Sequence, residues 1–111
     1  MLKLQPKATF WMTVSIPVPG DSKEEEIKVE VAYTGRKALV SGSLFEDVKH
    51  EEDPDVALAH KLVKGWKLVD SEFNTENLGT FLEAYSAAAP RIVSAYMEAL
   101  RGGVKEKNSQ T

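Results

Sequence analysis

The chain has 111 residues, of which 42% are hydrophobic and 28% are charged, and its net charge is −3. This balance is typical of one small globular domain and excludes a disordered chain. The negative charge argues against nucleic-acid binding, which needs a basic face. The absence of cysteine excludes a disulfide framework and thiolate chemistry. No apolar run approaches the roughly 18 residues of a membrane span, and the N-terminus lacks the apolar core of a signal peptide. We therefore expect a soluble intracellular protein without a membrane partner.

The first predicted elements are two strands that form a β-hairpin over about residues 8–33. Apolar side chains recur at every second position over residues 10–16 and again over residues 27–33, a pattern typical of strands with one buried face. Proline and glycine in residues 17–20 end the first strand. The acidic run Glu24–Glu26 is expected in solvent, within a loop longer than the common tight turns.

Trp11 falls on the opposite face of the first strand from Phe10 and Met12. One interpretation is that a long neighbouring side chain or a helix end covers the indole ring. The other is a subunit contact, because an open sheet edge is a template for strand addition. A two-stranded hairpin alone is marginal in water, so its apolar face must pack on the helices or pair with another chain.

Residues 35–50 carry a weaker helical pattern. Thr34 can cap a helix here, but Gly42 lies in its middle, and a glycine inside a helix costs about 1 kcal/mol relative to alanine. The sequence leaves open whether this segment forms one imperfect helix or two helices with a break near Gly42.

Capping residues predict three further helices. Asp53 followed by Pro54 marks a helix start, and we expect this helix to end at Gly65 in a left-handed conformation. Asn74 begins the next helix by the same capping logic, and Gly102 ends the last one.

Each of the two C-terminal helices presents an apolar stripe that it cannot bury alone, so the helices should pack on each other and on the preceding elements. The stripes are Leu78, Phe81, Leu82 and Tyr85 in the first helix, and Ala89, Val93, Tyr96 and Leu100 in the second.

The sequence thus predicts an α+β fold in which an N-terminal β-hairpin is followed by about four short helices. We expect one small domain over residues 1–111, with the helical part over about residues 35–102 and a frayed polar tail at residues 104–111.

No motif predicts catalysis, a cofactor or a metal site. His50 and His60 lack metal-ligand spacing. The acidic residues 51–55 do not match an EF-hand loop, and helix capping explains Asp53 and Asp55 more simply. No nucleophile motif or phosphate-binding glycine loop is present, so we do not expect an enzyme.

Aromatic side chains are the best candidates for contacts with another protein. Trp66 and Phe73 flank a small loop, where they could form an exposed patch or act as core anchors that pin the loop to the helices. Tyr85 and Tyr96 are expected to bury the ring while the hydroxyl reaches a polar partner. The candidate protein-contact residues are Trp11, Trp66, Phe73, Tyr85 and Tyr96.

A series of motifs follows the order found in a known family. The motifs are Gly65-Trp66, an acidic segment ending at Phe73, Asn77-Leu78 running into Tyr85, the Ala87–Ala89 link, Ile92-Val93, Ala95-Tyr96, Ala99-Leu100 and Lys107-Asn108. The segment from Ala8 to Gly20 is similar to that family's opening strand and turn. In this order the chain resembles the small tail assembly chaperones of long-tailed bacteriophages and prophages.

The resemblance implies a non-enzymatic chaperone in the host cytoplasm that binds the tape measure protein during tail assembly. It implies a homo-oligomer that coats this partner in several copies and is absent from the finished tail. In this family a longer form made by ribosomal frameshifting often recruits the tail tube protein. Two alternatives stay open: a minor tail or head–tail component, and a small ligand-binding or regulatory domain of a bacterial host.

Overall fold

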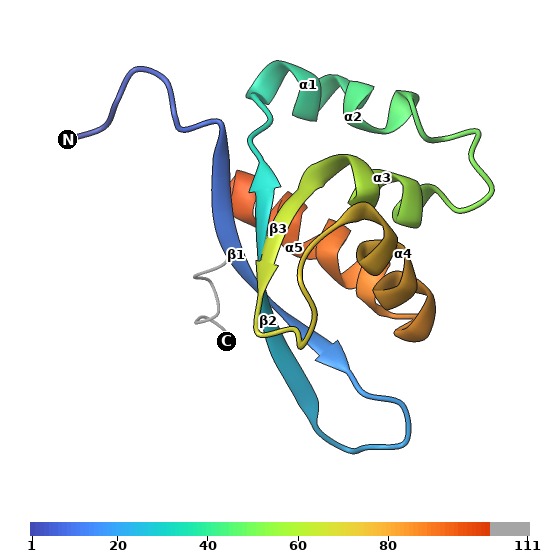
Figure 1. Cartoon of the computed structure of the whole chain (residues 1–111). Coiled ribbons are helices and arrows are strands. Elements are labelled where there is room, and N and C mark those ends of the chain that lie inside the picture. Colours follow the sequence, from blue (N-terminus) through green and yellow to red (C-terminus); the bar gives the residue numbers. More distant parts are fainter. Residues whose placement is uncertain (103–111) are drawn as a thin grey trace.

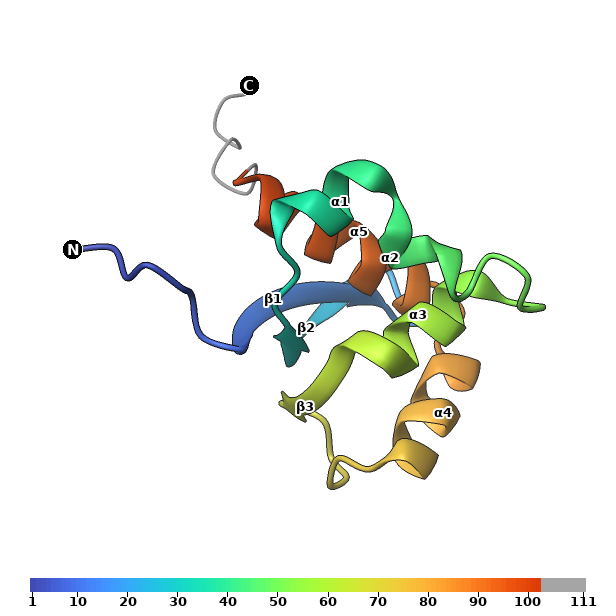
Figure 2. The ribbon, with the colours of Figure 1, turned by 90° about the horizontal axis from the view of Figure 1, so that it is seen from above.

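A three-stranded antiparallel sheet of order β1-β2-β3 is covered on one face by five helices (Figures 1 and 2). The computed structural model describes residues 1–102. The elements are β1 (Thr9–Pro17), β2 (Glu24–Ala32), α1 (Arg36–Ser41), α2 (Ser43–Glu46), α3 (Pro54–Leu62), β3 (Val63–Lys67), α4 (Thr75–Ala84) and α5 (Ala88–Arg101). The predicted α+β class and its N-terminal hairpin are confirmed, and the tail predicted at residues 104–111 lies outside the described residues.

The hairpin extends further at its tip than the sequence predicts. The ladder between β1 and β2 continues until Pro17 faces Glu24, so the acidic run Glu24–Glu26 belongs to a strand and not to the loop. Its side chains are exposed, as expected, because the tip projects beyond the helices. Tyr33 follows the last residue of β2 and is exposed, which corrects its predicted place on the buried face.

A third strand lies where the sequence predicts the end of a helix. Helix α3 ends at Leu62, and Gly65 pairs with Glu30 within β3 instead of ending the helix. A side chain at Gly65 would crowd this pairing, because a Cβ there would lie 3.2 Å from Oε1 of Glu30. Strand formation wins because β2 would otherwise leave a row of unpaired peptide groups beside the core.

The weak helical segment forms two short helices. Gly42 separates α1 from α2 with a left-handed φ of 79°, which glycine adopts without strain. The predicted cap at Thr34 is wrong, because Gly35 occupies the N-cap position of α1. No side chain caps the first N–H groups of this helix. The Thr34 hydroxyl is hydrogen-bonded to Tyr96 instead. The resulting break raises the helix number from about four to five.

The other predicted helix ends are confirmed. The Asp53 carboxylate accepts a hydrogen bond from the Val56 N–H at 3.3 Å, and the Asn74 side chain accepts one from the Asn77 N–H at 2.7 Å. Gly102 ends α5 with a left-handed φ of 74°.

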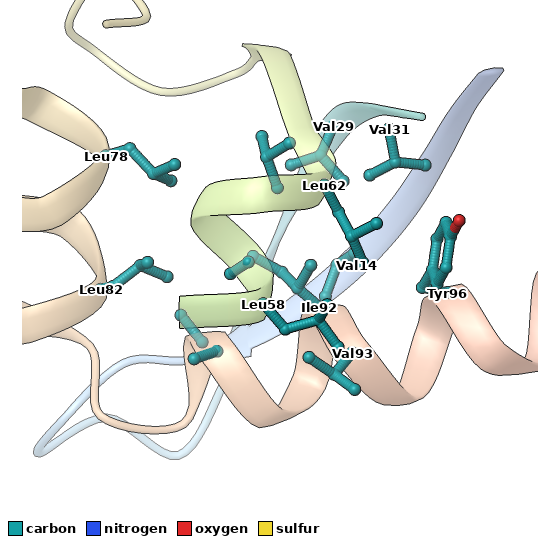
Figure 3. Packing of buried hydrophobic residues seen from close by; sticks show 14 of the residues in the cluster. Val14, Val29, Val31, Leu58, Leu62, Leu78, Leu82, Ile92, Val93 and Tyr96 are labelled. Atoms are coloured by element: carbon teal, nitrogen blue, oxygen red, sulfur yellow. The ribbon is translucent and has the colours of Figure 1, made fainter. Parts of the chain in front are cut away.

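The core forms where α3, α4 and α5 meet the apolar face of the sheet (Figure 3). Helix α5 packs against both β1 and α3. The side chains that Figure 3 labels come from strands β1 and β2 and from helices α3, α4 and α5. They are Val14, Val29, Val31, Leu58, Leu62, Leu78, Leu82, Ile92, Val93 and Tyr96.

Tyr96 joins α5 to both strands of the hairpin. Its ring is fully buried and stacks on Phe10 with 6.1 Å between the ring centroids. Its hydroxyl donates to the Ala32 carbonyl oxygen at 2.7 Å and therefore accepts from the Thr34 hydroxyl. Burial raises the pKa of the Tyr96 phenol, so it remains a neutral donor.

Arg91 forms a second link between α5 and the hairpin. Its guanidinium donates to the Ser15 carbonyl oxygen at 3.0 Å and to both carboxylate oxygens of Glu24, at 3.2 and 3.0 Å. The hydrogen bond and charge of Arg91 hold the pKa of the Glu24 carboxyl below its ordinary value. This link ties the N-terminal part of α5 to both strands near the hairpin tip.

We predict that Tyr96→Phe lowers the free energy of unfolding by about 1–2 kcal/mol, because it leaves the Ala32 carbonyl and the Thr34 hydroxyl without their partner. Urea unfolding of the purified variant measures this change. Tyr33→Phe is the matched control, since its ring is exposed, and it should change the value by less than about 0.5 kcal/mol. Equal effects of the two variants would contradict the role of Tyr96.

We also predict that Glu24→Gln changes how stability depends on pH. The folded pKa of Glu24 is lowered, so its stabilising contribution is present above the ordinary glutamate pKa and is lost as pH falls through the lowered value. Thermal unfolding at low salt should therefore show a small difference between wild type and variant at neutral pH that disappears in acid. A difference that stays constant into acid would contradict the ion pair with Arg91.

Candidate protein-binding groove

Two adjoining hollows lie between the hairpin tip, the β3–α4 loop and α4. Their volumes are about 280 and 170 Å³, and they share Val69, Asp70, Phe81 and Tyr85 in their walls. We call this continuous depression the aromatic groove. Its main apolar lining consists of Ile16, Ile27, Trp66, Leu68, Val69, Phe81 and Tyr85.

A chain of aromatic contacts builds the groove from β3 to the end of α4. Trp66 meets Phe73 and Phe81 edge-on, with ring centroids 5.3 and 5.5 Å apart, and Phe81 meets Tyr85 at 5.1 Å. The indole Nε1–H of Trp66 donates to the Ser71 carbonyl oxygen at 2.8 Å and holds the β3–α4 loop. These contacts support the interpretation of Trp66 and Phe73 as anchors of the loop.

The apolar stripe of α4 contributes side chains both to the core and to the aromatic groove. Leu78 and Leu82 are fully buried in the core, whereas Phe81 and Tyr85, three residues further along in each case, are half-buried and line the groove. The stripe is therefore wider than the core requires. This width is the sequence signal that could have identified Phe81 as a groove residue.

Leu68 is the least expected residue of the groove. Its φ of 70° is the only positive value among the non-glycine residues of the described chain, and its side chain is 69% exposed beside the groove. A leucine in this conformation costs about 1–2 kcal/mol. The loop bond from Trp66 to Ser71 spans Leu68, so the surrounding contacts hold the strained backbone in place. Nothing in the sequence pattern predicts this strain.

The remaining predicted contact residues lie elsewhere. Trp11 is 44% exposed on the face of the sheet opposite the helices, where the Lys67 ammonium lies 4.5 Å from its ring centroid. A long neighbouring side chain thus covers part of the indole, as the first interpretation has it. Tyr96 is fully buried and is not part of any surface. The structure therefore brings together Trp66, Phe73 and Tyr85 but separates them from Trp11.

The aromatic groove has no arrangement of groups for a reaction. The charged residues in its lining are Glu25 and Asp70, whose carboxylates lie in the walls of the larger, mostly apolar part formed with Ile16, Ile27 and Leu68. Within residues 1–102, no group of three or more histidine, cysteine or acidic side chains could hold a metal ion. His60 packs against Gly79 of α4. No helix in this part of the chain is long and apolar enough to cross a membrane.

Comparison with known proteins identifies the family. The family model described as phage tail assembly chaperone matches residues 1–108, nearly the whole chain. The chain therefore belongs to the phage tail assembly chaperone family. No curated protein and no solved structure matches it.

We predict that Leu68→Asn raises the free energy of unfolding by about 1 kcal/mol, because asparagine tolerates the left-handed conformation better than leucine. Chemical denaturation of the two proteins measures the difference. Leu68→Ala is the matched control, because it removes the same exposed side chain but keeps a residue that disfavours a positive φ. If Ala and Asn stabilise the protein equally, the strain at Leu68 is not the cause.

Proposed function

We propose that this chaperone binds the tape measure protein during tail assembly and shields its apolar stripes in the aromatic groove. The observation that carries this proposal is Leu68, an apolar side chain held in solvent beside Phe81 and Tyr85 by a strained backbone. Strain that persists at an exposed apolar residue is typical of binding sites. Membership of the tail assembly chaperone family supports a partner among the tail proteins.

The lining of the groove suits an amphipathic helix. Such a helix inserts apolar side chains at successive turns into an apolar groove. The half-buried rings of Trp66, Phe81 and Tyr85 offer surface without requiring new ordering of their side chains, because they already pack on one another. The carboxylates of Glu25 and Asp70 favour a helix with lysine or arginine beside its apolar stripe.

Several copies along one tape measure protein would bind strongly even if each contact is modest. Weak individual contacts also let tail tube subunits displace the chaperone one copy at a time. We propose that the protein works in this way as one domain in the host cytoplasm, self-associates, performs no catalysis and uses no cofactor. In an extended form it would recruit the tube protein. The family match favours this function over a minor tail component or a host ligand-binding domain.

The test is light scattering and calorimetry with a helical fragment of a phage tape measure protein. The wild-type protein should form a multi-copy complex. Leu68→Asn should weaken binding about tenfold, because it removes an apolar side chain worth roughly 1.5–3 kcal/mol on full burial.

Val40→Asn is the matched control, since Val40 is an exposed apolar residue of α1 and lies outside the groove. It should leave the affinity unchanged. A wild-type protein that ignores the fragment would overturn the tape measure proposal. Equal loss in the Leu68 and Val40 variants would overturn the assignment to the aromatic groove.

A further inference from the structure

Within residues 1–102, no strand pairs with β1 on the side away from β2, so this edge is open in the described part of the chain. Ala8 accepts a hydrogen bond from the Tyr33 N–H at 2.8 Å, so the even-numbered peptide groups of β1 face β2 and the odd-numbered ones face outward. The outward carbonyl of Ser15 is occupied by Arg91. The outward groups of residues 9–13 remain as a short template for a further strand.

A partly apolar hollow of about 400 Å³ lies beside this edge. It is formed by β1 and the C-terminal half of α5, and its apolar walls include Phe10, Met12, Ala95 and Ala99. Glu98 lies in the same wall and has no ion-pair partner among residues 1–102. A strand added to the edge of β1 would therefore find an apolar surface and a free carboxylate on its helix-facing side.

Residues 1–7, which we call the arm, extend away from the body of the protein (Figures 1 and 2). Leu2 and Leu4 are 95% and 100% exposed. The arm carries Lys3 and Lys7 and no acidic residue. A basic segment with two fully exposed leucines at alternate positions has the composition of a strand that lacks its partner surface.

We propose that the arm of one copy adds antiparallel to the β1 edge of a second copy, with Leu2 and Leu4 in the hollow beside α5. In antiparallel pairing, the side chains of two directly opposed residues point to the same face of the sheet. Arm residues that bond the outward peptide groups of Trp11 and Thr13 therefore place their side chains on the face away from the helices, as Trp11 and Thr13 do. We assign these positions to the odd-numbered arm residues, because this register turns Leu2 and Leu4 toward the apolar hollow. The leucines at even positions point to the helix side, where the apolar hollow lies.

Pro6 fits this register. It also has an even number, so its nitrogen faces away from β1, where the ladder needs no donor. The seven residues of the arm span about 23 Å when extended, enough for the roughly 16 Å of edge from Thr9 to Thr13. The odd-numbered Lys3 and Lys7 lie on the opposite face, away from the helices, so only the leucines enter the apolar hollow.

The receiving edge belongs to another copy because the arm continues directly into its own β1. Ala8 is already held by Tyr33, and the arm extends away from the body with Leu2 and Leu4 in solvent, so these leucines do not occupy the hollow of their own copy. An arm that leaves one copy and enters the next makes a head-to-tail contact, which generates rings or open chains. The inference rests on the multi-copy function proposed above and names the surface that joins the copies.

Cross-linking of the full chain without any tape measure fragment tests this contact. The protein has no cysteine, so Leu4→Cys and Ala99→Cys introduce single thiols. One variant is isotope-labelled, the two are mixed under mild oxidation, and mass spectrometry measures the mixed disulfide. We expect it to form about tenfold faster than the disulfide between Leu4→Cys and Val40→Cys, because binding concentrates the paired thiols.

Equal rates for the Ala99 and Val40 pairs would overturn the proposal. So would a double variant, Leu4→Cys with Ala99→Cys, that forms its disulfide only within one chain. Light scattering adds an independent readout: Leu4→Glu should abolish the concentration-dependent oligomer while the melting temperature of the protomer stays unchanged. A strict monomer in the wild type would overturn the arm exchange and the proposed self-association but leave binding of the tape measure fragment in the aromatic groove untouched, so the arm exchange and the groove proposal fail separately.

Discussion

The sheet has a single apolar face, and burying that face against α5 determines the position of every other element. Tyr96 fixes this contact, because its ring stacks on Phe10 while its hydroxyl bonds the end of β2. Helix α3 then fills the space beside α5, and β3 follows from α3 without a loop because it completes the open side of β2. A domain of this size has few core residues, so one well-placed tyrosine has a large structural effect.

The opposite face of the sheet, away from the helices, is mainly polar. It carries polar side chains that bond one another across strands, such as the Thr9 hydroxyl with the Glu30 carboxylate at 2.7 Å. Lys67 covers part of Trp11 on the same face. This arrangement keeps one side of the sheet compatible with solvent, so the surfaces left for partners are at the margins of the core: the aromatic groove and the β1 edge.

The aromatic groove and the β1 edge differ in the groups that they offer to a partner. In the groove, apolar rings pack on one another and a strained Leu68 supplies exposed apolar surface, which suits a partner recognised through side chains. At the β1 edge, peptide groups are the main feature, which suits a partner recognised through its backbone. On the two proposals made above, client and second copy would use separate surfaces, so neither contact would have to be broken to make the other.

The sequence by itself determined the hairpin and the helix starts at Asp53 and Asn74, because these depend on local periodicity and on capping residues that act on their neighbours in the chain. It left open whether the helix over residues 35–50 breaks at Gly42, which the structure shows. It also indicated Trp66 and Phe73 as neighbours of one loop. Tertiary structure alone decided that residues 63–67 form a strand, because the open edge of β2 outweighs the helical pattern there. It likewise decided which groups the Tyr96 hydroxyl bonds, the exposure of Leu68 and the partner of Thr34, because each depends on contacts between segments far apart in the chain.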